Sequence, residues 1–274
     1  MEPGVDLQLR EHLAGTSTLV VSKITVQGSL HAVGTQNSPV IFEGNANGAP
    51  NDITQGGIEL KAQGELELRF FRVSQASVGV LKQGDSSCLI EDGRFLSCQV
   101  GYQGLTDAGG AQTSALRRVE IRDCAGNGIF INQGEVILDE VSVRNSKGAG
   151  VFLSSKQDLV TTSASLDRCE LDNNEGGNLV LDGNATVDMG CSNLIPASGD
   201  GKNVSFQDNN KAPAGVLPMT DCYWGLPSPQ NEEAIRDATF EGRLNQTTWA
   251  RETDLSGFRG AAIDFSNSAD PCNS

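Results

Sequence analysis

The feature that most constrains this chain is an internal repeat of short apolar segments, each ending in a turn-forming residue. The copies are Val73–Ala76, Phe95–Cys98, Ile121–Cys124, Val143–Ser146, Leu171–Asn174 and Phe206–Asn209. They lie 22, 26, 22, 28 and 35 residues apart. Two residues earlier runs a second column, apolar except at its glycine: Phe71, Gly93, Val119, Val141, Cys169 and Val204. Alternation with a period of two is typical of β-strands.

After most copies comes a glycine and another short apolar run. These glycines are Gly57, Gly79, Gly101, Gly128, Gly150 and Gly177. Each unit has room for about three short strands, but not for a crossover helix of about 10 residues. Parallel strands need long connections, and a coil that returns to the same column once per unit supplies them. The repeat therefore predicts an all-β parallel β-helix, with an antiparallel sandwich as the less favoured alternative.

The polar ends of the repeat have a matching interpretation. Asp123, Asn145, Asn173 and Asp208 fall where the coil must bend. Asn and Asp tolerate left-handed backbone and bond to the local main chain. We therefore expect these four residues to turn the chain.

Several segments resemble secreted bacterial right-handed parallel β-helix repeat proteins of the pectate-lyase-like superfamily. Residues 23–44, KITVQGSLHAVGTQNSPVIFEG, resemble the opening rung of that group, and Glu2–Val5 resembles its preceding E-P-G-V turn. Asp221–Gly225 resembles the N-x-W-W-G element that follows the last rung, although Asp-Cys stands where Asn is common, and Ile235–Asp237 resembles its I-x-D companion. The resemblance covers about residues 2–245 and implies an extracellular or cell-surface protein whose leader is missing from this sequence.

The repeat stops before the C-terminus, which suggests two regions. We expect the β-helix to occupy residues 1–215, and residues 216–274 to form a C-terminal cap with an irregular tail. Ser228-Pro229 followed by two glutamates predicts a short helix near 229–238, because these residues suit a helix N-terminus. The cap would cover a strand edge that otherwise promotes aggregation.

Composition excludes several classes of protein. The 274 residues carry 20 Lys and Arg against 35 Asp and Glu, a net charge of −15. Nucleic-acid binding needs a basic surface, so we expect no nucleic-acid partner. No apolar run approaches the roughly 20 residues of a membrane-spanning helix. We expect a monomer without a membrane span.

Charged residues on successive rungs form the best polar candidate site. The outward stacks would be Arg118–Glu140–Arg168, Glu120–Ser142–Glu170 and Arg122–Arg144–Asp172. A solvent-exposed ladder of alternating charges is the simpler interpretation, but it does not explain why Arg122 and Arg144 would be neighbours. These two arginines could clamp a carboxylate or sulfate. We therefore keep Glu120, Arg122, Arg144, Glu170 and Asp172 as ligand-binding candidates.

An apolar stripe is the second candidate site. Phe130, Phe152 and, with a one-residue shift, Val180 would face outward on successive rungs. They would either stack on sugar faces or a partner protein, or pack beneath a long loop such as 103–115 or 155–165.

Seven cysteines leave at least one thiol unpaired. Cys98 and Cys124 share a column on adjacent rungs, within disulfide range if the rungs are about 4.8 Å apart, although two reduced buried thiols are equally compatible with this. Cys222 and Cys272 could join the tail to the cap. The segment 182–188 imitates the start of a calcium loop, but its twelfth position is Asn193 instead of Glu. We expect no metal or other cofactor, with a surface Ca²⁺ as the alternative.

These observations favour a non-catalytic extracellular module for surface structure, adhesion or glycan binding, with a polysaccharide or a cell-surface protein as its partner. The alternative is a lyase or epimerase on acidic glycans that uses the charged face. No paired aspartates of the kind needed for glycoside hydrolysis accompany the glycine strands, and both histidines, His12 and His31, lie near the N-terminus. We therefore identify no catalytic residue. A groove that gathers basic and acidic groups would favour the enzyme.

Overall fold

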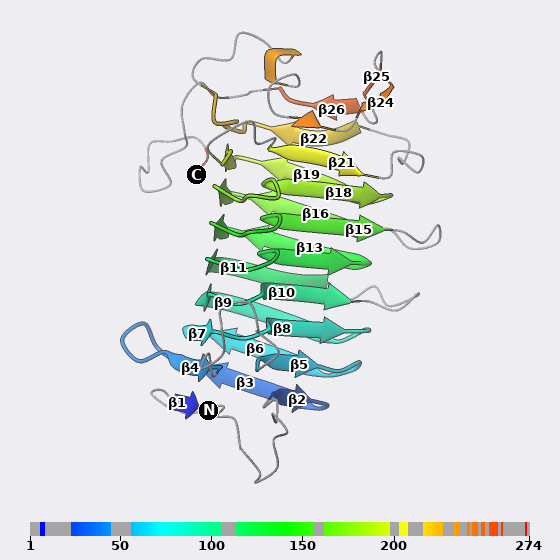
Figure 1. Cartoon of the computed structure of the whole chain (residues 1–274). Coiled ribbons are helices and arrows are strands. Elements are labelled where there is room, and N and C mark those ends of the chain that lie inside the picture. Colours follow the sequence, from blue (N-terminus) through cyan, green and yellow to red (C-terminus); the bar gives the residue numbers. More distant parts are fainter. Residues whose placement is uncertain are drawn as a thin grey trace, which may run out of the picture.

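The computed structural model describes residues 6–8, 23–44, 56–105, 113–155, 162–197, 203–207, 216–226, 233–235, 240–241, 243–245, 248–249, 252–256, 259 and 272. In these residues the chain winds as a coil, and the strands of successive turns stack as parallel neighbours (Figure 1). The single antiparallel pair of named strands in these ranges is β24 (Arg243–Asn245) with β25 (Thr248–Trp249). The predicted all-β coil is confirmed.

Each complete turn contributes three strands. The first strands are β3 (Ser29–Val33), β6 (Glu65–Arg69), the first halves of β9 (Ser87–Leu96) and β11 (Thr113–Arg122), β13 (Gly134–Asp139), β16 (Thr162–Asp167), β19 (Thr186–Gly190), β22 (Val216–Thr220) and β26 (Glu252–Asp254). The second strands are β4 (Val40–Glu43), β7 (Phe71–Ser74), the second halves of β9 and β11, β14 (Ser142–Arg144), β17 (Glu170–Asp172) and β20 (Asn193–Ile195), with β1 (Asp6–Gln8) beside β4. The third strands form a separate nine-stranded sheet of β2 (Ile24–Val26), β5 (Ile58–Leu60), β8 (Val78–Gln83), β10 (Val100–Leu105), β12 (Ile129–Asn132), β15 (Val151–Ser155), β18 (Leu179–Gly183), β21 (Val204–Gln207) and β23 (Phe240–Glu241).

The apolar column of the repeat lies inside the coil. Its members pair in register on consecutive turns and are buried: Val73, Phe95, Ile121, Val143, Leu171 and Leu194. Burying one such side chain stabilises the fold by roughly 1.5–3 kcal/mol. The column is the continuous core that a single turn could not form alone.

The end of the predicted repeat is wrong by one strand. Leu171 pairs with Leu194, whereas Phe206 and Val204 lie in β21, beside Leu181 and Leu179 of the third-strand sheet. No Asn or Asp ends the segment at 194, because Ile195-Pro196 follows it. Because this turn signal is absent, the sequence pattern assigned the next copy to Phe206–Asn209, which ends in Asp and Asn.

In the described residues, all three kinds of bend use left-handed backbone, and the bend between third and first strands contains Gln63, Gly84, Gln133 and Gly183. The bend between second and third strands contains Asp123, Asn145 and Asn173, with φ of 58°, 56° and 53° as predicted, while Asp208 lies outside the described residues. The amide of Asn145 donates to Asp123 at 3.2 Å and that of Asn173 to Asn145 at 2.8 Å. The bend between first and second strands is also one left-handed residue, and it shapes the groove described below.

The glycine that interrupts the second column has a steric explanation. Phe71 and Phe95 pack edge to face with centroids 5.2 Å apart. A Cβ on Gly93, which lies between them in sequence, would fall 2.1 Å from the Phe71 ring. Gly93 thus leaves the space that this aromatic ring fills.

Parallel stacking continues after residue 215, because β22 pairs with β19, β26 pairs with β22, and β23 pairs with β21. The division of the chain at 215 stays a prediction. Residues 233–235 form a helical turn, and the remainder of the predicted 229–238 helix lies outside the described residues. Trp224 and Ile235 are buried in the core. No helix in the described ranges is long and apolar enough to cross a bilayer.

Candidate functional site

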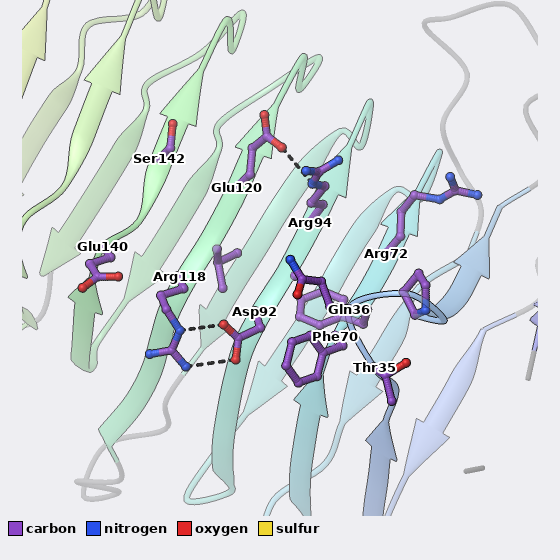
Figure 2. Close-up of a pocket in the computed structure, with 14 residues that line it drawn as sticks. Thr35, Gln36, Phe70, Arg72, Asp92, Arg94, Arg118, Glu120, Glu140 and Ser142 are labelled. Carbon is purple, nitrogen blue, oxygen red and sulfur yellow. Dashed lines mark hydrogen bonds and ion pairs between the residues drawn. The ribbon is translucent and has the colours of Figure 1, made fainter. Parts of the chain in front are cut away.

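A groove of about 640 Å³ crosses the outer face of the second strands. Its volume lies within the range of roughly 300–1,000 Å³ that is typical of small-molecule sites. Two rows of side chains run along it, one residue per turn (Figure 2). The strand row is Arg72, Arg94, Glu120 and Ser142, and the bend row is Phe70, Asp92, Arg118 and Glu140.

The bend row stands out from the coil because each of its members makes the one-residue turn between first and second strands. The φ angles of Phe70, Asp92, Arg118 and Glu140 are 48°, 53°, 52° and 56°. A bulky residue such as Phe70 rarely adopts this conformation, and such backbone outliers concentrate at functional sites. Phe70 is only half-buried although it is aromatic.

Arg118 and Asp92 form a two-pronged ion pair at the centre of the bend row. Arg118 donates from Nε to Oδ1 at 2.6 Å and from Nη2 to Oδ2 at 2.9 Å (Figure 2). These hydrogen bonds lower the pKa of Asp92 below its ordinary value and raise that of Arg118. Asp92 is therefore ionised at neutral pH.

The strand row contains one paired and one unpaired arginine. Arg94 Nε lies 3.1 Å from Glu120 Oε2. Arg72, its neighbour on the preceding turn, makes no ion pair or hydrogen bond within the described residues, and its Nε is shielded from solvent. Its guanidinium thus has unused donors at the edge of the groove.

Glu140, at the far end of the bend row, also has an ion-pair partner. Arg168 Nη1 lies 3.0 Å from Glu140 Oε1, and Arg168 additionally contacts Asp139 and Asp167. Each carboxylate of the groove therefore faces an arginine.

The family described as right-handed β-helix region matches residues 12–163, more than half of the chain. The chain is a member of the right-handed β-helix family. It is also similar to the crystal structure of the catalytic unit of a thermostable GH87 α-1,3-glucanase from Streptomyces thermodiastaticus strain HF3-3, with 12% identity and a TM-score of 0.44. That alignment covers 98% of this chain and 66% of the glucanase chain. No curated protein matches the chain.

Two of the three charged stacks predicted for this β-helix are confirmed as strand neighbours, and the third lies in a bend. Glu120, Ser142 and Glu170 pair on successive turns, as do Arg122, Arg144 and Asp172. Of the five ligand-binding candidates, Glu120 alone lines the groove. The binding role of all five stays a prediction.

The adjacent arginines of that face have acidic neighbours that offset their mutual repulsion. Arg144 Nη2 donates to Glu170 at 2.6 Å, and Arg122 Nε lies 3.9 Å from Glu120 and 3.8 Å from Asp123. Burial raises the pKa of Asp172, and the nearby Glu170 raises it further. The ladder of alternating charges therefore accounts for this pair without a ligand.

The apolar stripe lies on the third-strand sheet of the β-helix, away from the second strands that carry the groove. Phe130 pairs with Phe152, and Phe152 with Val180. The two phenylalanines are half-buried, with ring centroids 5.4 Å apart, and Val180 is buried. Residues 106–112 and 156–161 of the expected covering loops lie outside the described residues, so the function of the stripe stays a prediction.

Neither candidate disulfide forms, and the alternative of two reduced buried thiols holds for Cys98 and Cys124. Cys98, Cys124 and Cys222 are free buried thiols, and Cys272 bonds to Cys191 instead. Each of the three thiols donates to the carbonyl two residues before it, which directs it into the bend and away from a partner. Cys191 is a left-handed bend residue, and such residues carry their side chains outward.

No group of three or more potential metal ligands occurs among the described residues. At the start of the imitated calcium loop, Asp182 is buried and accepts a hydrogen bond from Ser154 at 3.2 Å. The expectation of no metal and its alternative, a surface Ca²⁺, both stay predictions.

The sequence stacks included half of the two rows and missed Phe70, Arg72, Asp92 and Arg94. Phe70, Asp92, Arg118, Glu140 and Arg168 each precede a member of the second apolar column, and four of the five are charged. The sequence did contain a signal for this bend, because a charged residue recurs directly before the second apolar column. The sequence analysis placed Arg118, Glu140 and Arg168 on a strand face, because it had identified only one bend.

Proposed function

We propose that this β-helix is a non-catalytic extracellular module that binds a polysaccharide, free or attached to a cell-surface protein, along the groove. The observation that carries the proposal is the pair of parallel rows, in which ion-paired arginines and carboxylates adjoin the half-buried ring of Phe70. Sugars present hydroxyl groups that both donate and accept hydrogen bonds, together with an apolar face that packs on aromatic rings. The two rows supply both kinds of contact.

The charges of the groove favour binding over hydrolysis. Glycoside hydrolysis generally needs one protonated carboxyl group and a second, ionised one. Arg118 instead lowers the pKa of Asp92, and arginines contact Glu120 and Glu140. The described carboxylates are suited to accept hydrogen bonds from a ligand.

A lyase or epimerase on acidic glycans is the second candidate, because the groove does gather basic and acidic groups, as such an enzyme would require. Arg72 is the specific residue that favours it, since an unpaired guanidinium could neutralise a uronate. The assay is the ultraviolet absorbance of unsaturated uronate products over a polyuronate panel, with and without added Ca²⁺. Product formation would replace the binding proposal with this one, and product formed only with Ca²⁺ would establish a metal requirement.

Binding is tested on an array of neutral and acidic glycans, followed by calorimetry with the best binder. Phe70→Asn removes the aromatic ring and keeps a residue that tolerates the left-handed bend, and Arg118→Gln removes the central ion pair. We expect each to weaken binding about tenfold, which corresponds to about 1.4 kcal/mol. Lys147→Gln removes an exposed cation outside the groove and serves as the control. Absence of binding across the array, or equal losses in all three variants, would contradict the proposal.

A further inference from the structure

One end of the groove is closed by an insertion at a bend. In the next turn, β6 ends at Arg69 and β7 begins at Phe71, so a single residue makes the turn. In the first turn, β3 ends at Val33 and β4 begins at Val40, so the same bend contains residues 34–39. Thr35, Gln36 and Pro39 line the groove beside Phe70. We call residues 34–39 the end loop.

Backbone hydrogen bonds hold the end loop in place. The Thr35 and Ser38 amides donate to each other's carbonyls at 3.1 and 3.0 Å. The loop is also fixed to the next turn, because Gly34 donates to Arg69 at 2.8 Å and Val40 donates to Phe70 at 2.9 Å. Figure 2 shows Thr35 and Gln36 projecting from this loop at the end of the two rows, next to Phe70.

At the opposite end, the described residues of the next turn contain no such insertion. Beyond Glu140 and Ser142, the next turn passes from β16, which ends at Asp167, to β17, which begins at Glu170, through the short bend at Arg168. A polymer that lies along the rows can therefore extend past Ser142 over the turn of Arg168, before it reaches the turn at which Cys191 is bonded to Cys272, whereas it meets the end loop directly beyond Phe70.

At the closed end lies Arg72, the groove arginine that makes no ion pair or hydrogen bond with any described residue. Arg72 lines the groove together with Phe70, Gln36 and Thr35, and its Nε is shielded from solvent without a hydrogen bond. A guanidinium matches the geometry of a carboxylate or a sulfate with two parallel hydrogen bonds. The net charge of the chain is −15, but salt screens distant charges over about 8 Å at physiological ionic strength. Arg72 and the other nearby charges therefore matter more at this end than the net charge of the chain does.

We propose that the groove receives the end of a glycan chain and that Arg72 binds a carboxylate or sulfate on its terminal sugar. This inference rests on the proposed glycan-binding function. The end loop blocks continuation of the polymer, so a site that would otherwise accept any stretch of chain selects a terminus.

The stoichiometry of the wild-type protein tests chain-end selection directly. Calorimetry is performed with short, medium and long oligomers of galacturonate, of mannuronate and guluronate, and of sulfated galactan. Recognition of one chain end gives one protein per chain at every length. Recognition of internal stretches gives a number of proteins per chain that increases with length, which would overturn the inference and leave the proposed function intact. Absence of binding to all charged and neutral oligomers would overturn both.

Two variants then separate the loop from the arginine. Replacing Gly34–Pro39 by a single Asn, which suits the one-residue bend, should let the number of proteins per chain increase with chain length. Arg72→Gln should weaken binding of acidic oligomers about tenfold without changing that of their methyl-esterified or desulfated forms, and Arg72→Lys should restore part of the loss. Equal losses for acidic and neutral oligomers would overturn the role of Arg72. Circular dichroism checks that each variant is folded, and the wild-type stoichiometry decides chain-end selection even if the loop variant is not.

Discussion

At the scale of single residues, a recurrent use of cysteine follows from the bends. The residue after a left-handed bend residue is repeatedly Cys or Ser, and its side chain donates to the carbonyl two positions earlier. The examples are Cys98 to Leu96, Cys124 to Arg122, Cys169 to Asp167, Ser192 to Gly190 and Cys222 to Thr220. A small donor at this position satisfies a carbonyl beside the turn. These cysteines are therefore explained by geometry without a disulfide or a metal.

Burial should make these thiols unreactive. It raises the pKa of Cys169 and Cys222 to about 12 and that of Cys98 to about 11. Because thiolate is the reactive form, we expect a thiol reagent at pH 8 to label none of the five free cysteines in the folded protein and all five in urea. Reduction before denaturation should raise the number to seven. Rapid labelling of the folded protein would contradict the buried geometry.

The Asp92–Arg118 pair predicts a pH-dependent contribution to stability. The pKa of Asp92 is lower in the folded chain than its unfolded value of about 3.9. The stabilisation is therefore present above about pH 4 and is lost as the pH falls through the folded pKa. Asp92→Asn should lower the free energy of unfolding by less than about 1 kcal/mol at pH 7, because the pair is partly exposed.

The difference between wild type and Asp92→Asn should shrink as the pH falls through the folded pKa of Asp92, as measured by urea denaturation at each pH. Arg118→Gln and the double variant complete a double-mutant cycle, which gives the coupling free energy between Asp92 and Arg118. A difference that persists unchanged at low pH would show that the substitution acts by another route.

At the scale of elements, the packing of β7 against β9 depends on the Phe71 ring filling the space that Gly93 leaves because it has no side chain. Gly93→Ala would place a methyl group against Phe71, and we expect a loss of about 1–3 kcal/mol, as for other overpacked cores. Phe71→Leu in the same chain should recover part of it. Urea denaturation of the two single variants and the double variant measures the coupling, and additive losses would exclude direct contact as the cause.

The strands show what periodicity can and cannot predict. The apolar column that begins at Val73 and the glycine column that contains Gly79 identified the coil and its register. They do so because inward side chains repeat once per turn. The groove was less visible, since a one-residue bend such as Asp92 leaves no gap between strands. The Cys191–Cys272 disulfide joins residues 81 positions apart, and no periodic signal reports where the tail returns.

At the scale of the whole molecule, each turn contacts mainly its two neighbours, so stability is close to a sum of local terms. The Cys191–Cys272 disulfide closes a long loop over the C-terminal turns. Cross-links of this kind typically stabilise by about 2–4 kcal/mol, chiefly by restricting the unfolded chain. Their effect in a coil should be greatest in the turns that they enclose.

Cys272→Ser should therefore loosen the C-terminal end more than the middle. We expect faster hydrogen exchange for amides of β22, which lies within the cross-linked segment, and unchanged exchange for β11. Cys222→Ser, which leaves the disulfide intact, is the matched control. Equal acceleration in β11 and β22 would mean that the coil unfolds as one cooperative unit.

The end loop has a consequence for how proteins of this shape diversify. It replaces a single bend residue with six and leaves the flanking β3 and β4 in their ordinary places in the stack. A similar insertion at another bend of this row should leave the core packing unchanged, because the bend residues lie outside the core. Moving such a loop by one turn would lengthen or shorten the groove by about 4.8 Å. The size of the ligand that fits would therefore change in steps of one turn.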